Sequence, residues 1–259
     1  MKIRNAILSL ALVAAAATQA HAQAVQLRFL PAVGQVAHYR TTTRMWASGD
    51  TTAAPMLSTM YSTRTVTGMD GANYILKTVM DSTVTTMPGG GGPGGRPGMG
   101  GDMMRGMTIT QHLDPRGHVL SSEVTPPPGL PPFVANMMSR NSGSNNNRNT
   151  PMWPEGPVSP GYTWTDTLVQ SASAGRGRPT QFTFIVTYKF ERIEHQGGTR
   201  LAIISANGVS QGGQTGTYTG EVAVDLDAGR LGHMAMNMSM QAEGSSTPMR
   251  MKMTMEALP

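Results

Sequence analysis

The stretch Phe182-Thr-Phe-Ile-Val-Thr-Tyr-Lys-Phe190 indicates how this chain folds. Large apolar side chains occupy every second position, at Phe182, Phe184, Val186, Tyr188 and Phe190. Successive side chains of a β-strand point to opposite faces, so these five share one face, while Thr183, Thr187 and Lys189 lie on the other. One apolar and one polar face are typical of an antiparallel sheet with one side in solvent.

The same alternation recurs in both halves of the chain, in runs bounded by Gly, Pro, Asn and Asp. Each half begins with a strand that follows a glycine, Gly34 in the first half and Gly161 in the second. Two strands joined by a tight turn come next. A strand that ends in Leu-Asp, a turn that contains Gly and a further strand complete each half. The runs are 36–46, 62–67, 73–81, 107–114 and 118–124, then 162–168, 182–193, 200–206, 222–227 and 230–240. This self-similarity indicates a duplicated supersecondary unit.

We therefore expect an all-β fold, an antiparallel half-open barrel or strongly curved sheet, with a β-sandwich as the alternative. The first repeat is 23–125, and the second is 156–259. Between them lies a Pro-rich linker, 126–155, with a short helix over Phe133 to Ser139 and an Asn/Ser-rich loop. Roughly 235 residues suit one domain made of both repeats. The stretches 87–106, 141–150 and 212–220 lack the apolar content that offsets ordering entropy, which predicts mobile loops.

The N-terminus has the pattern of an export signal. Lys2 and Arg4 precede an apolar run over 6–17, and Ala20-His-Ala22 is the small-x-small pattern that a signal peptidase cuts after. The run is shorter than the ~20 residues of a membrane-spanning helix. We expect residues 1–22 to be removed and the mature protein to begin near Gln23, periplasmic or secreted. With no cysteine, the chain is not a lipoprotein and has no disulfide.

Charge gives no case for nucleic acid. The formal net charge is +5, and removal of Lys2 and Arg4 with the signal leaves 5 − 2 = +3. The segment Gly175-Arg-Gly-Arg-Pro179 matches a short minor-groove hook, but an exported protein meets no chromosome. We interpret it as a basic connecting loop.

The linker run Pro157-Val-x-x-Gly161-x-x-Trp164 has extended prolines before a glycine that permits a sharp entry into a strand. With the Leu-Asp-turn-Gly segments at Leu113 and Leu226, it resembles a family of uncharacterised exported bacterial β-proteins. That family is similar in shape to half-open β-barrels that carry lipids or lipoproteins between membranes. The resemblance implies a carrier and supplies no catalytic residues. The Gly-Met-rich and Asn-rich loops depart from the family pattern.

Methionine is the outlier of the composition, with 22 residues. Eight of them form two alternating runs that we expect to pair into one wall: Met234, Met236, Met238, Met240, Met249, Met251, Met253 and Met255. The polar residues between them point to the opposite face. We therefore expect the thioethers of both runs to form one continuous wall on one face of a curved sheet.

Three interpretations of this wall are open. The residues are simply core, each stabilising the fold by about 1.5–3 kcal/mol when buried. Alternatively, flexible and polarizable side chains line an adaptable pocket for an apolar ligand. Thirdly, soft thioethers bind Cu(I), helped by Met103, Met104, Met107 and His112.

No catalytic or cofactor site is expected. Gly208-Val-Ser-Gln-Gly212 matches a nucleophile elbow but precedes Gly and Thr residues that do not continue as a helix. The histidines lack metal-ligand spacing, and Asp114 and Asp227 suit turn closure. An activity assembled from scattered residues stays open.

We expect a non-enzymatic periplasmic binding or carrier protein for an apolar or lipid-like ligand. The alternatives are a structural or interaction module of the cell envelope that contacts a protein partner through its loops, and a Met-based copper-binding protein.

Overall fold

In the computed structural model, the described residues are 24–46, 50–88, 104–132, 135–136, 151–172, 180–211, 215–241 and 247–259. Within them lie eleven strands: β1 (Val36–Trp46), β2 (Met56–Asp70), β3 (Asn73–Thr86), β4 (Thr108–Leu113), β5 (Val119–Thr125), β6 (Thr163–Ala172), β7 (Thr180–Gln196), β8 (Thr199–Gln211), β9 (Thr215–Asp225), β10 (Arg230–Gln241) and β11 (Met249–Leu258).

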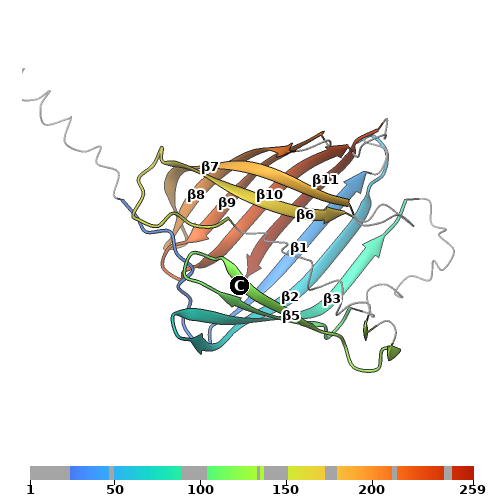
Figure 1. The fold of residues 1–259 in the computed structure, drawn as a ribbon, viewed down its shortest axis with the longest axis horizontal. Helices are drawn as coiled ribbons and strands as arrows, with labels where there is room; N and C mark the ends of the chain where they lie inside the picture. The colour runs from blue at the N-terminus through green and yellow to red at the C-terminus, as the bar shows by residue number, and fades with distance from the viewer. Residues whose placement is uncertain are drawn as a thin grey trace, which may run out of the picture.

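All eleven strands belong to one antiparallel sheet in the order β5-β4-β3-β2-β1-β11-β10-β9-β8-β7-β6. The sheet curls around its concave face without closing, because the edge strands β5 and β6 do not pair (Figure 1). The predicted all-β half-open barrel or curved sheet is therefore confirmed, and the chain forms a single sheet instead of the two of the β-sandwich alternative.

Two meanders, β1–β5 and β6–β11, make up the sheet, and the pairing of β1 with β11 joins them. This pairing runs from His38 opposite Leu258 to Trp46 opposite Arg250. The meanders correspond broadly to the two halves of the sequence, whereas their origin by duplication and the assigned domain bounds stay predictions.

Strand β7 has the alternation that its sequence predicts. Phe184, Val186, Tyr188 and Phe190 are at most 1% exposed, whereas Thr187 lies on the exposed face. The side chain of Phe182 falls outside the described residues. A two-residue turn, Gly197-Gly198, then leads into β8 with φ of +58° and +86°. Positive φ at both positions defines a type I′ turn, the hand that suits twisted hairpins.

The prediction of a loop over 212–220 is wrong for residues 215–220, which belong to β9. Its glycines allow close packing: a Cβ on Gly216 would lie 3.1 Å from a ring carbon of Phe184, and one on Gly220 would lie 2.8 Å from the carbonyl oxygen of Ala235. The glycine content of this segment predicted a loop. In the structure, the close approach of neighbouring strands is the reason for glycine at these positions.

The other expected loops fall largely outside the described residues, namely 89–103 of the first and all of 141–150. Of the expected helix over 133–139, only Ala135 and Asn136 are described, and the amide of Ala135 donates to the carbonyl of Pro131 at 3.1 Å. The described part of the chain contains no apolar helix of membrane-spanning length. The expected signal segment, 1–22, lies outside it.

A pair of substitutions in β7 tests the two faces of this strand. Phe184→Ala should lower the free energy of unfolding by about 3–5 kcal/mol, since it removes a fully buried ring. Thr187→Ala, on the exposed face, should change it by less than about 0.5 kcal/mol. Urea denaturation of both variants measures the difference, and similar losses would contradict the assigned face.

Candidate functional site: a cavity on the concave face of β1 to β5

The two halves of the concave face are filled differently. In the half formed by β6–β11, the apolar residues of β7 pack in one hydrophobic cluster with methionines of β10 and β11. Met234, Met236, Met238, Met240, Met253 and Met255 are at most 9% exposed, and Met249 and Met251 are partly buried against the same cluster. The pairing of β10 with β11 sets Met234 opposite Met255 and Met240 opposite Met249.

This methionine face is packed core in the structure. The phenol of Tyr218 donates to the thioether of Met236 at 2.9 Å, and burial raises the pKa of Tyr218 to about 12. Met238 and Met251 also border a second hollow, but its other lining residues are mostly polar, among them Asn237, Ser239 and Lys252. The expected role of the eight methionines as a ligand wall stays a prediction.

An apolar-lined cavity of about 200 Å³ lies in the other half, on the concave face of β1–β5. Every second residue of these strands lines it, as strand geometry requires. The lining includes Ala37 and Tyr39 of β1, Met60, Ser62, Arg64 and Val66 of β2, Leu76, Thr78 and Met80 of β3, and Ile109, Gln111 and Leu113 of β4. The eight methionines of β10 and β11 do not line it.

Two segments close one end of this cavity, and we call residues 24–31 together with 151–158 the strap. Val25 and Val158 form an isolated antiparallel bridge between the two segments. The strap is hydrogen bonded to two turns. The amide of Phe29 donates to the carbonyl oxygen of Pro115, between β4 and β5, at 2.9 Å. The amide of Leu30 donates to the carbonyl oxygen of Gly229, between β9 and β10, at 3.2 Å. Figure 1 shows both segments at the same end of the sheet.

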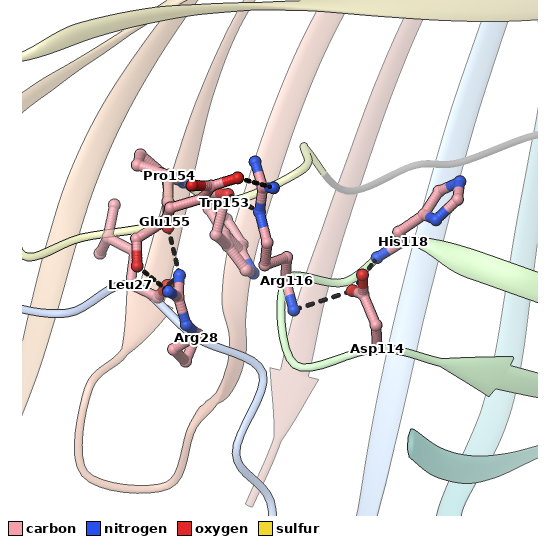
Figure 2. A network of polar contacts seen from close by, with 8 residues as sticks. All are labelled: Leu27, Arg28, Asp114, Arg116, His118, Trp153, Pro154 and Glu155. Carbon is pink, nitrogen blue, oxygen red and sulfur yellow. Dashed lines mark hydrogen bonds and ion pairs between the residues drawn. The ribbon is translucent and has the colours of Figure 1, made fainter. Parts of the chain in front are cut away.

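Arginine side chains fasten the strap (Figure 2). The guanidinium of Arg28 donates to the carbonyl oxygens of Pro154 and Glu155. Arg116, in the turn between β4 and β5, donates from Nε to the carbonyl of Trp153 at 2.9 Å and from a terminal nitrogen to the carboxylate of Glu155 at 2.9 Å. Trp153 is 5% exposed and lines the cavity. Trp153, near the C-terminal end of the expected linker, thus contributes to the wall of the cavity.

Asp114 shapes the turn that carries Arg116. Its carboxylate accepts hydrogen bonds from the amides of Arg116 at 2.8 Å and His118 at 2.9 Å, as expected from the sequence. Gly117, with φ of +79°, brings the turn close to the indole of Trp153, 3.5 Å from where a Cβ would lie. Asp227 has a different partner from the one expected, since Arg200 holds it across the hairpin at 2.7 Å and lowers the pKa of its carboxyl.

Arg64 is the residue of this site that sequence reasoning missed. It lies at the centre of the lining of β2, and burial lowers the pKa of its guanidinium. The signal was present, because Ser62, Arg64 and Val66 share one face of an alternating strand. A charged residue on the face that also bears Val66 was readable from the sequence.

His112, one of the candidate copper ligands, lies away from the concave face in the described part of the chain. Ile109, Gln111 and Leu113 line the concave face, so His112 of the same strand points to the opposite face, 3.9 Å from the carboxylate of Asp70. Met107 is buried, and Met103 lies outside the described residues. Among the residues that the structure describes, no three His, Asp or Glu side chains form a metal-binding group.

The chain matches no protein-family model and no curated protein. The family resemblance inferred from the linker therefore stays a prediction.

Removal of the turn carboxylate tests how the strap is held. Asp114→Ala should lower the free energy of unfolding by about 1–2 kcal/mol through loss of two charge-assisted hydrogen bonds. It should also speed hydrogen exchange of the amide of Trp153, which donates to the carbonyl of Arg116 at 2.9 Å. Asp50→Ala is the control, because Asp50 closes a different loop through Thr52. Unchanged exchange at Trp153 in the Asp114 variant would contradict this role.

Alkaline titration tests the packed methionine face. An unfolded tyrosine ionises near pH 10, whereas Tyr218 keeps its proton up to about pH 12. Between these values the native state binds more protons than the unfolded state, so stability falls as pH rises, by on the order of 2–3 kcal/mol from Tyr218 at pH 12. Urea unfolding should show a shallower decline for Tyr218→Phe. Equal declines would mean that Tyr218 is not buried against Met236.

Proposed function

We propose that this protein is a non-enzymatic binding or carrier protein for an apolar or lipid-like ligand, held in the cavity of β1–β5. The observation that carries the proposal is the contrast between the two halves of one concave face. One half is filled by its own side chains, and the other has a cavity of about 200 Å³ with an apolar lining.

The composition of the lining fits a ligand site. Val66, Leu76, Ile109 and Leu113 supply apolar surface, and polar side chains, three of them arginines, lie among them. Apolar surface with placed polar groups is usual for small-molecule sites. An engineered apolar cavity of about 150 Å³ is sufficient to bind benzene, so the volume suits at least part of a larger apolar molecule. The unclosed edge between β5 and β6 leaves a side from which a longer ligand can extend.

The proposed compartment follows from the expected signal peptide, so the ligand would be met in the periplasm or outside the cell. A carrier of lipid-like molecules there accords with the shape resemblance inferred from the linker.

A second candidate, a structural or interaction module of the cell envelope, is favoured by a separate observation. Six of the eight methionines in the alternating runs are buried core, which needs no ligand to explain it.

Titration with N-phenyl-1-naphthylamine, a neutral probe whose fluorescence increases in apolar surroundings, tests the proposal. The mature wild-type chain should bind one probe molecule. Gln111→Trp, which adds bulk within the cavity, should raise the Kd at least tenfold, or about 1.4 kcal/mol.

The matched control is Val209→Trp, which adds the same ring at a side chain that is 61% exposed on β8. It should bind the probe like the wild type. Absence of saturable binding to the wild type would reject the carrier proposal and leave the structural module. Equal binding by the wild type and the Gln111 variant would place the ligand elsewhere.

A further inference from the structure

Arg64 lies on β2 in the lining of the cavity, and its neighbours within the sheet are uncharged. Its partners across the sheet are Ala37 on β1 and Thr78 on β3, and both are small. Along β2, the flanking residues on the same face are Ser62 and Val66. None of these four side chains carries a charge that offsets the guanidinium.

The contacts of the guanidinium are weak ones. Its central carbon lies 4.7 Å from the centroid of the Tyr39 ring, and one terminal nitrogen lies 3.6 Å from the sulfur of Met255. The Nε atom is buried without a hydrogen-bond partner in the described structure. The Tyr39 ring is itself fixed, since its hydroxyl donates to the carbonyl of Leu231 at 3.1 Å. The cation is therefore positioned but not neutralised.

The described residues offer no carboxylate within ion-pair distance of Arg64. Asp225 acts electrostatically on Tyr39, as Arg64 does, and its Oδ1 accepts from the amides of Asp227 and Ala228 at 3.0 and 2.9 Å. Its other oxygen lies 3.9 Å from Nε of Arg230, which also lines the cavity. The Nε of Arg230 has no hydrogen-bond partner in the described part either. Unsatisfied donors of Arg64 and Arg230 thus lie in the lining of the cavity, while Asp225 already accepts two backbone hydrogen bonds.

A buried cation without a counter-ion is costly unless something pairs with it. Arginine does not lose its proton at neutral pH, even where burial lowers its pKa. Its planar fork of donors suits two oxygens of a carboxylate or phosphate. An anionic group from outside the chain would satisfy the donors that the protein leaves open.

We propose that the cavity binds a single-chain amphiphile with an anionic oxygen head group, that the guanidinium of Arg64 pairs with this head, and that the apolar lining holds the chain. The inference rests on the proposed function and specifies its ligand class. Tyr39 is a positioning residue that holds the guanidinium beneath its ring. Leu76, Ile109 and Leu113 supply the surface for the alkyl chain.

Isothermal titration of the full mature chain with matched twelve-carbon probes tests the head group. Dodecanoate should bind at least tenfold more tightly than dodecanol, and dodecyltrimethylammonium should bind more weakly than dodecanol. Acetate and inorganic phosphate, which carry the charge without the chain, should not bind measurably.

Three arginine variants test whether Arg64 causes the preference for the anionic head group. Arg64→Met should remove the preference for dodecanoate over dodecanol and leave dodecanol binding within about threefold of the wild type. Arg44→Met is the matched control, because Arg44 is exposed on β1 and the change removes the same net charge. It should keep the full preference. Arg64→Lys, which retains charge without the planar fork, should keep part of it.

The outcomes separate this inference from the proposed function. Equal binding of dodecanoate and dodecanol by the wild type overturns the anionic head group while the carrier proposal stands. Binding of neither probe rejects both. Acetate or phosphate binding as tightly as dodecanoate would show a small-anion site and overturn the amphiphile.

Stability of the empty protein gives an independent measurement. Removal of a partly buried cation without a counter-ion should raise the Tm of Arg64→Met above that of the wild type without ligand, whereas Arg44→Met should leave the Tm unchanged. A lower Tm for Arg64→Met would mean that Arg64 is a structural residue, which overturns the inference whatever the probes show.

Discussion

The pairing of the first strand with the last is the constraint on which the rest of this structure depends. The nine register pairs between β1 and β11 convert two separate meanders into one continuous sheet. They also place the two sequence-adjacent strands β5 and β6 at opposite edges, so the linker between them has to cross from one edge to the other. The second segment of the strap, 151–158, lies on this crossing, which explains why a proline-containing stretch between the two meanders packs on the core and contributes Trp153 to the wall of the cavity.

The same pairing divides the concave face between two kinds of lining. The larger hydrophobic cluster is centred on β7–β11, where aromatic rings and thioethers meet. Beside β1, the separate cluster of the first half has only four buried residues, Val66, Tyr74, Leu76 and Leu113. Methionine suits the filled side because an unbranched, flexible side chain fits the irregular gaps between large rings. The first half has no comparable set of large side chains, and a cavity is the result.

Much of the fold was predictable from the sequence because period-two alternation is a local property. The run 182–190 and the methionine runs each specify a strand and its buried face without reference to other residues. Residues 215–220 were misjudged, since glycine indicates a loop when its close neighbours in space are unknown. The site was harder for the same reason. Whether the methionine face is a wall or a core depends on Phe184 and Tyr218, which approach it only in the folded sheet.

The lack of a counter-ion at Arg64 could not be predicted from the sequence. Alternation places it on the face of Val66, yet whether a carboxylate accompanies it there depends on the strands that pair with β2. In the observed register, the residues opposite Arg64 are Ala37 on β1 and Thr78 on β3, and neither is charged.

A sparsely packed half beside a well-packed one has a thermodynamic consequence. Regions with few buried apolar contacts open locally at lower free energy than the rest of a protein. A ligand that fills the cavity and pairs with Arg64 would add, in the half of the sheet that lacks them, both apolar contacts and a counter-charge. A ligand that binds only the native state stabilises it by mass action. Its added protection against local opening would be largest in β1–β5, where the ligand would make its contacts. The well-packed half of the sheet would then serve as the support, and the ligand would complete the core of the other half.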